Sequence, residues 1–288
     1  MPHNGAMNYD HAFHAGNHAD VLKHLVLLAL IDALARKPTP FLALDTHAGR
    51  GEYALDSAAA TATGEADHGA LRLLQATPDP DSAPAALARY LGAVRPYLAA
   101  RRYPGSPRLI LDALRENDRL ACCELHPDAA RALKALLAGD ARAGVHQRDG
   151  YAALPALLPP REKRGLVLID PPYEAQLAEF DQVIDALRAA LARWPQGIYA
   201  LWYPIKQRRA LAPFFRRAAA LPARSVLVAE LMRHPDDSPL RLNGSGMLLL
   251  NPPWKLDDDL RDALPALARA LSETPNSWRL EWLREDAS

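Results

Sequence analysis

A short apolar run that ends in an acid, two prolines and an aromatic residue constrains this chain more than any other stretch. The run spans residues 165–169, and its tip is Asp170-Pro171-Pro172-Tyr173. A run without polar alternation is typical of a parallel strand, because both faces of a parallel sheet are buried. Open α/β folds bind ligands beyond the carboxyl ends of such strands, so the tip is predicted to border a ligand site. An ordinary strand end with a proline turn is the competing interpretation.

The chemistry of this tip suits the amino group of a nucleobase. The carboxylate of Asp170 and the carbonyl of Pro171 can both accept hydrogen bonds from an exocyclic amine. The two prolines fix the turn, because proline locks φ and has no N–H group. Tyr173 offers a flat face on which a base could stack.

Apolar runs elsewhere predict six further strands, most of them separated by helices. These strands are Phe41–Asp45, Leu120–Glu124, Gly144–Arg148, Ile198–Tyr203, Ser225–Leu231 and Gly246–Leu250. Only fourteen residues separate the last two strands. A right-handed helical crossover between parallel strands needs a longer connection than this one, which is rich in Pro, Asp and Gly. The pair is therefore predicted to be antiparallel. Seven strands in a mixed sheet with a reversed last pair predict an α/β fold of the Rossmann-like, class I methyltransferase type.

Helical patterns fill most of the connections between these strands. They are predicted at residues 17 or 18 to 35, 127–138, 152–158, 175–194, 207–220 and 256–271. Lys23 and His24 fall in the first turns of the first helix. Ser106 followed by Pro107 resembles an N-cap and a first helical position, which does not exclude ligand contact by Ser106.

The turn after the first predicted strand could hold a cofactor. It contains His47, Gly49 and Gly51. This spacing lacks the third glycine of the dinucleotide fingerprint, so it favours a cofactor without a phosphate over a dinucleotide. Glycines let the backbone approach a ligand closely, and His47 could form part of the pocket wall. A purely structural loop remains an equal alternative.

Two further acids end predicted strands. Glu124 ends the second strand, where Rossmann-type folds hold ribose hydroxyls. Asp149, followed by Gly150, ends the third strand, where it could accept a hydrogen bond from an adenine amine or form a solvated turn. Glu124 lies 73 residues after Gly51, rather than the usual ~20, so a segment has been inserted between them.

The inserted segment is predicted to form a small helical subdomain. Residues 58–98 are rich in Ala and Leu, with prolines that limit the length of each helix. We therefore expect residues 52–102 to form the insert, and residues 1–51 and 103–288 to form the main domain.

Asn251-Pro252-Pro253-Trp254 is a rival to the Asp170 tip, since an Asn oxygen and a proline carbonyl could accept the same hydrogen bonds. The order of the strands favours Asp170. It ends the fourth strand, which should lie beside the first, whereas Asn251 ends the seventh. We expect the second motif to be structural.

The amino-terminal region is unusually rich in histidine, with five of the ten histidines in the first 24 residues. A metal site is nevertheless not expected. His14 and His18 lack a Cys or carboxylate at familiar ligand spacing, and Gly16 breaks a shared helical face.

The composition of the chain constrains its binding partners and the compartment in which it is expected. Lys plus Arg and Asp plus Glu number 34 each, so any contact with a polyanion must come from a local patch of basic residues. Cys122 and Cys123 are adjacent in an apolar run and are expected to be reduced and buried. The sequence has no signal-peptide pattern and no apolar run of eighteen residues, so a cytoplasmic protein without a membrane partner is expected.

Several long motifs resemble the RlmJ family of 23S ribosomal RNA adenine-N6 methyltransferases. The likeness spans essentially the whole chain and is weakest at residues 58–100. The motifs are Phe13-His14-Ala15-Gly16-Asn17-His18-Ala19-Asp20-Val21-Leu22-Lys23-His24, Leu44-Asp45-Thr46-His47-Ala48-Gly49, Tyr103-Pro104-Gly105-Ser106-Pro107, Glu124-Leu125-His126-Pro127, Asp170-Pro171-Pro172-Tyr173, Ala200-Leu201-Trp202-Tyr203-Pro204 and Asn251-Pro252-Pro253-Trp254-Lys255.

The resemblance implies methylation of the N6 amine of one adenine in 23S ribosomal RNA, with S-adenosylmethionine as cofactor. It implies a monomer with a helical insert. Asp170 would be the catalytic acceptor of the amine proton, and Tyr9, His11 and Lys23 would lie near the target base. The implied cofactor site consists of His24, His47, Ser106, Glu124, Asp149, Gly150 and Asp170.

Two other functions compete with this one. A DNA adenine-N6 methyltransferase could use the same acceptors, because they do not distinguish the two sugars. A methyltransferase-like RNA-binding protein without catalysis is less favoured, because no expected cofactor or catalytic residue is replaced.

Overall fold

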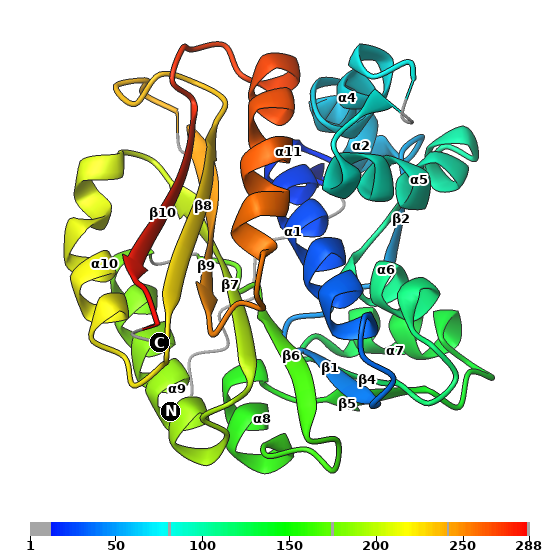
Figure 1. Ribbon diagram of the computed structural model, residues 1–288. Helices are drawn as coiled ribbons and strands as arrows, with labels where there is room; N and C mark the ends of the chain where they lie inside the picture. Colours follow the sequence, from blue (N-terminus) through cyan, green and yellow to red (C-terminus); the bar gives the residue numbers. More distant parts are fainter. Residues whose placement is uncertain (1–12, 80–81, 174–175, 241, 287–288) are drawn as a thin grey trace, which may run out of the picture.

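A single mixed sheet with helices on both faces forms the centre of the molecule (Figure 1). The computed structural model describes residues 13–79, 82–173, 176–240 and 242–286. Tyr9 and His11 lie outside the described residues, so their expected contacts with the base stay predictions. No helix within these ranges has the length and apolar character needed to cross a membrane.

The main sheet has eight strands in the order β10-β8-β9-β7-β6-β1-β4-β5. All seven predicted strands are present, and β9 runs antiparallel to both β7 and β8, which confirms the reversed pair. The strands are β1 Phe41–Asp45, β4 Arg119–Glu124, β5 Ala143–Gln147, β6 Arg164–Ile169, β7 Ile198–Ile205, β8 Val226–Met232, β9 Gly244–Leu250 and β10 Trp278–Arg284.

The eighth strand, β10, corrects the expected count of seven. It pairs antiparallel with β8 and forms one edge of the sheet. Its residues alternate apolar Trp278 and Leu280 with charged Arg279 and Glu281, and none of its residues is fully buried. An edge strand needs little apolar sequence, so a pattern of buried apolar runs does not predict it.

Helix α1 (His18–Ala35) lies against the sheet on one side and the insert on the other, and nearly all its residues are buried. Its N-cap is Asn17, whose Oδ1 accepts hydrogen bonds from the backbone N–H groups of Ala19 and Asp20. The other helices of the main fold are α6 Ser106–Ala113, α7 Pro127–Leu136, α8 Gly150–Leu157, α9 Gln176–Arg193, α10 Ala212–Ala219, which follows a 3₁₀ turn at Arg208–Leu211, and α11 Leu256–Leu271.

The insert shares a hydrophobic core with the main fold. Its helices are α2 Ala58–Thr63, α3 Glu65–His68, α4 Ala70–Ala76 and α5 Ala85–Ala99. They are joined to the main fold by an antiparallel ribbon of β2 (Glu52–Ala54) and β3 (Arg102–Pro104). Tyr90 of α5 and Leu25 of α1 belong to one continuous cluster of buried side chains. The division into two domains at 52 and 102 stays a prediction.

A buried carboxylate holds each end of the central strand β1. At its start, Asp118 accepts a hydrogen bond from the backbone N–H of Phe41 and pairs with Arg115. At its end, Asp45 is fully buried and accepts a hydrogen bond from Oγ of Ser106 at 2.7 Å. Burial raises the pKa of Asp45 to about 7, and the hydrogen bond from Ser106 only partly opposes this.

The Asp45→Asn variant should become increasingly stable relative to the wild type as the pH rises. Because the folded-state pKa of Asp45 is raised, its favourable contribution is full below pH ~4 and is lost as the pH rises to about 7. The gain at pH 8 should reach a few kcal/mol, on the order of 1.4 kcal/mol per pKa unit. Urea unfolding at pH 5 and pH 8 measures it.

Asp118→Asn is the matched control with the opposite sign. Burial alone would raise the pKa of Asp118, but hydrogen bonds from Arg115 and Phe41 outweigh burial and lower it. Its contribution is therefore present above pH ~4 and lost in acid, so this variant should be destabilised at pH 7. An Asp45→Asn protein that loses stability at pH 8 to the same extent as Asp118→Asn would contradict the assignment.

Candidate active site

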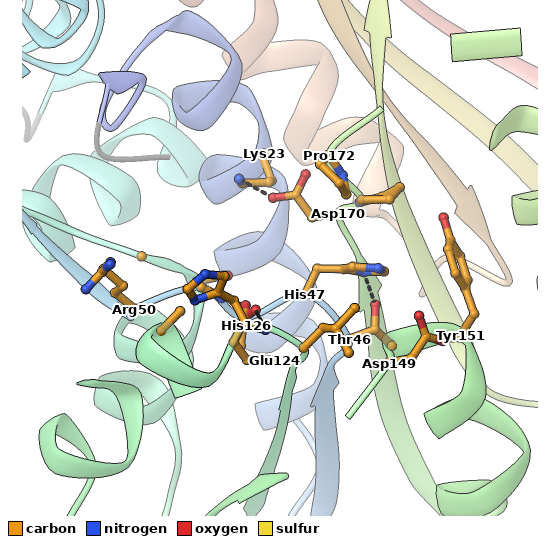
Figure 2. A pocket seen from close by; sticks show the side chains of 18 of the residues that line it. Lys23, Thr46, His47, Arg50, Glu124, His126, Asp149, Tyr151, Asp170 and Pro172 are labelled. Atoms are coloured by element: carbon orange, nitrogen blue, oxygen red, sulfur yellow. Dashed lines mark hydrogen bonds and ion pairs between the residues drawn. The ribbon is translucent and has the colours of Figure 1, made fainter. Parts of the chain in front are cut away.

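A cavity of about 470 Å³ opens at the carboxyl edge of the four parallel strands β6, β1, β4 and β5 (Figure 2). All seven residues expected to contact a cofactor line it, together with two of the five expected near the base. The seven are His24, His47, Ser106, Glu124, Asp149, Gly150 and Asp170, and the two are Lys23 and Pro171. Residues separated by almost 150 positions in the sequence therefore meet at one edge of the sheet.

Glu124 organises the glycine turn that follows β1. Its Oε2 accepts a hydrogen bond from the backbone N–H of Gly49 at 2.8 Å, and its Oε1 accepts one from that of His126 at 2.7 Å. Gly49 has a φ of 62°, a left-handed conformation that glycine adopts without strain. The strand-end acid and the turn thus form one wall of the cavity.

Asp149 and Gly150 bring helix α8 close to this wall. Asp149 is the N-cap of α8, and its Oδ1 accepts a hydrogen bond from the backbone N–H of Ala152 at 2.7 Å. A Cβ atom on Gly150 would lie 2.2 Å from the carbonyl oxygen of Thr46, so only glycine permits this approach. Both the cofactor interpretation of Asp149 and its role as a turn residue are compatible with this position.

His47 is held neutral at the side of the cavity. Burial lowers its pKa to about 4, although Asp170 and Asp149 oppose the effect. Nδ1 lies 2.8 Å from Oγ1 of Thr46, and the ring packs edge-on against Tyr151 (Figure 2). A neutral imidazole in this place can contact a ligand without adding positive charge.

Asp170 forms an ion triad with Lys23 and Asp20 of α1. Lys23, on α1, points toward Asp170 in Figure 2, with Nζ 2.6 Å from Oδ2 of Asp170 and 2.8 Å from Oδ1 of Asp20. Only 4% of Lys23 is exposed, so it is not a surface residue. Burial alone would lower the pKa of Lys23, but the two carboxylates outweigh burial and raise it well above its ordinary value.

Asp20 is a member of the triad that the sequence interpretation missed. Its Oδ2 accepts a hydrogen bond from the backbone N–H of Gly16 at 2.9 Å, and Asp20 is 2% exposed. The spacing of Asp20 and Lys23 on one face of a helix was the available signal, but such i,i+3 pairs are usually solvated.

Ser106 differs from its expected role as an N-cap. Gly105 occupies the N-cap position of α6, and Ser106 is the first helical residue. From this position its hydroxyl does not cap the helix, and it donates to the carboxylate of Asp45.

Tyr173 does not have the accessible face that was expected. Its ring packs against Phe180 and Trp202, 6% of the residue is exposed, and its hydroxyl donates to the carbonyl oxygen of Trp202 at 3.0 Å. It is not among the residues that line the cavity. In this structure a base cannot stack on Tyr173, which instead anchors the tip to strand β7.

Asn251 lies at the amino ends of the parallel strands, whereas Asp170 lies at their carboxyl ends. It follows β9, which is antiparallel to β7, so it meets the residues that precede β7. Its Nδ2 donates to the carbonyl oxygens of Pro195 and Gly197, and its Oδ1 accepts from the backbone N–H of Arg224. Every polar atom of this side chain is used within the fold, which agrees with a structural role.

His14 of the histidine-rich segment forms a pair with a residue of the insert. Its Nδ1 lies 2.9 Å from Oε1 of Glu65. Within the described residues, no group of three or more His, Cys, Asp or Glu side chains is arranged to hold a metal ion.

Comparison with known proteins identifies the family. A family model described as "RsmJ: Ribosomal RNA large subunit methyltransferase D, RlmJ" matches residues 38–284. Ribosomal RNA large subunit methyltransferase J of Escherichia coli (strain K12) is 42% identical over 264 residues, which cover 91% of this chain and 92% of that protein. The protein of the same name from Haemophilus influenzae is 38% identical over 282 residues, 96% and 99% of the two chains.

A solved structure agrees with these relatives. The crystal structure of protein LPL1258 from Legionella pneumophila matches with a TM-score of 0.83 and 30% identity, and the match covers 95% of this chain and 99% of that one. The resemblance found in the motifs is thereby confirmed over nearly the full length. The chain belongs to the RlmJ family of ribosomal RNA large subunit methyltransferases.

Proposed function

We propose that the protein transfers a methyl group from S-adenosylmethionine to the exocyclic N6 amine of one adenine in 23S ribosomal RNA. Family membership supports ribosomal RNA methylation. One observation carries the choice of an amine: Asp170 and Pro171 line the cavity beside Lys23, at the carboxyl edge of the sheet. A carboxylate and a carbonyl at one strand end are acceptors for the two N–H bonds of an amino group.

The size and the lining of the cavity support the proposed cofactor. Its volume of about 470 Å³ lies in the usual range for small-molecule sites, roughly 300–1,000 Å³. Glu124 would hold ribose hydroxyls and Asp149 the adenine amine, while His24, His47 and Ser106 would contact the remainder. The bound cofactor supplies a methyl group on a positively charged sulfur, which the carboxylates of this edge would favour.

Asp170 is proposed to overcome the weakness of the nucleophile. The lone pair of an adenine amine is delocalised into the ring, so the nitrogen attacks poorly while it is planar. Hydrogen bonds from the two N–H groups to Asp170 and the Pro171 carbonyl would stabilise a tetrahedral nitrogen more than a planar one. The base must be unpaired or extruded from its stack to enter the cavity.

Lys23 would hold Asp170 in the orientation that the amine needs. Its ammonium group already donates to Oδ2 of Asp170, and Asp170 makes no other hydrogen bond within the described residues. Oδ1 is therefore the oxygen available to an amine. The second carboxylate, Asp20, holds Lys23 from the other side, so the cation stays in place when Asp170 turns toward a base.

The part of the base-binding site that covers the ring is left to the amino-terminal residues. Tyr173 is buried, so Tyr9 and His11 are proposed to contact the ring of the base, while Asp170 and Pro171 bond its amine and Lys23 lies near it. The expected monomer is retained in this proposal.

Mapping N6-methyladenine in 23S ribosomal RNA from cells with and without this protein tests the function. One adenine should lose its methyl group when the protein is absent. In competition with purified protein, 23S fragments should be methylated in preference to duplex DNA. Preference for the duplex would support the DNA methyltransferase alternative, and no binding of S-adenosylmethionine in calorimetry would support a protein without catalysis.

Asp170→Ala and Asp170→Asn should each lower the rate of methyl transfer by about 10²–10³-fold, the usual loss when one group that stabilises a transition state is removed. Asn retains an acceptor oxygen but loses the charge, so it should retain more activity than Ala. Single-turnover methylation of a 23S fragment measures this.

Asn251→Ala is the control for the Asp170 variants. It removes three hydrogen bonds at the far edge of the sheet, so it should lower stability while activity per folded molecule stays near that of the wild type. Activity that survives Asp170→Ala and is lost in Asn251→Ala would overturn the assignment of the acceptor.

Lys23→Met should lower the rate of methyl transfer, because it removes the ammonium group that holds Asp170. Oδ2 of Asp170 would lose its hydrogen bond and the carboxylate would face the like charge of Asp20, so it would no longer be oriented toward the base. Single-turnover methylation per folded molecule should fall, but less than in Asp170→Ala. Lys134→Met, at an exposed position of α7, should leave the rate unchanged.

A further inference from the structure

A buried chain of hydrogen bonds connects the insert to the cavity. Nδ1 of His24 lies 2.8 Å from the hydroxyl of Tyr103, and that hydroxyl lies 3.2 Å from the hydroxyl of Tyr90. The three residues come from three separate elements, namely α1, β3 and α5. His24 is 1% exposed, and both tyrosines are fully buried. The chain therefore runs from the inserted helix α5 to a side chain that lines the cavity.

Ring packing fixes the geometry of this chain independently of the hydroxyl groups. The rings of His24 and Tyr103 are stacked, with centroids 5.5 Å apart and planes inclined by 25°. A Phe substitution at Tyr103 would keep this contact and remove only the hydrogen bond. The role of the hydroxyl can thus be separated from that of the ring.

The hydrogen atoms of the two hydroxyls decide the direction of the chain. Burial raises the pKa of both Tyr90 and Tyr103, so each carries one hydrogen to donate. Within the described residues, Tyr103 is the one hydrogen-bond partner of the Tyr90 hydroxyl. If Nδ1 of His24 were the donor, one of the two hydroxyl hydrogens would have no acceptor, which is unfavourable in a buried site.

One arrangement uses both hydroxyl hydrogens. Tyr90 donates to Tyr103, and Tyr103 donates to Nδ1 of His24. Nδ1 is then an acceptor, and in a neutral imidazole the hydrogen must be on Nε2. The second ring nitrogen of His24 would accordingly be a donor and not an acceptor.

We propose that Tyr90 and Tyr103 are positioning residues that hold His24 as its Nε2–H tautomer, so that the insert sets which hydrogen-bonding group the cofactor site contains. This inference rests on the proposed function only in assigning the cavity to S-adenosylmethionine. It gives the insert a part in cofactor recognition besides any contact with RNA. The substituents that His24 can recognise are restricted to acceptors, such as a carboxylate or a hydroxyl oxygen.

The tautomer is tested by NMR on protein labelled with ¹⁵N-histidine, at a pH where His24 is neutral. In the wild type, Nε2 of His24 should carry the hydrogen and Nδ1 should show the shift of an unprotonated acceptor. In Tyr103→Phe the Nδ1 signal should move toward that of a mixture of tautomers, and in Tyr90→Phe it should move part of the way. A protonated Nδ1 in the wild type would overturn the inference.

Kinetics of the same variants test the consequence. Tyr103→Phe should raise the KM for S-adenosylmethionine about three- to tenfold with little change in kcat, the effect of one lost hydrogen bond. Tyr97→Phe is the control, since Tyr97 lies on α5 as Tyr90 does but its hydroxyl bonds Asp112 and Arg108 of α6, so KM should not change. A Tyr103→Phe protein with wild-type KM and wild-type Nδ1 shift would refute the positioning role.

The two readouts separate this inference from the proposed function. If the protein does not methylate adenine, the NMR measurement still tests the tautomer of His24 by itself. If methylation is found but the Nδ1 signals of wild type and Tyr103→Phe coincide, only the positioning role fails. Tyr90→Phe gives the same test if Tyr103→Phe does not fold.

Discussion

The buried ammonium group of Lys23 links helix α1 to the end of strand β6, the two elements that carry Lys23 and Asp170. It lies between Asp20 of its own helix and Asp170 at the end of β6, so the first helix and the fourth of the predicted strands must be in register for the charges to balance. A buried ammonium group that loses one of its two carboxylates is strongly unfavourable. The Lys23–Asp170 ion pair therefore determines how α1 packs against the sheet more than it adds to the stability of the fold. The cavity then forms between α1 and the strand ends.

The direction of β9 explains why two similar motifs have different environments. Asp170 and Asn251 both follow buried strands and both precede two prolines and an aromatic residue. Because β6 is parallel to β1 while β9 is reversed, the two tips are at opposite edges of the sheet. Asn251 bonds backbone groups of the loops that precede β7 and β8, which would otherwise lack partners. Composition of a motif therefore gave less information than the polarity of the strand that carries it.

Patterns that depend on the backbone were predictable from the sequence, and those that depend on side-chain packing were not. Strand ends at Glu124, Asp149 and Asp170 could be aligned because parallel strands place their carboxyl ends at one edge. The burial of Tyr173, the Asp20–Lys23 pair and the Tyr90–Tyr103–His24 chain arise from contacts between distant elements, which no local pattern contains. Strand β10 was missed for another reason, since an edge strand is only half buried.

The distribution of charge around the cavity bears on how one site could accept both a cation and an RNA. Carboxylates of Glu124, Asp149 and Asp170 occur at three strand ends, where a positively charged cofactor would be favoured and a phosphate disfavoured. Arg50 and His126 line the same cavity from the turns after β1 and β4 (Figure 2), and Arg50 is exposed. The charge of Lys23 is balanced by the carboxylates of Asp170 and Asp20, so it is not available to neutralise RNA. Among the described residues that line the cavity, the positive charge that a polyanion would meet is therefore that of the exposed Arg50, which favours entry of the uncharged base and keeps the backbone outside.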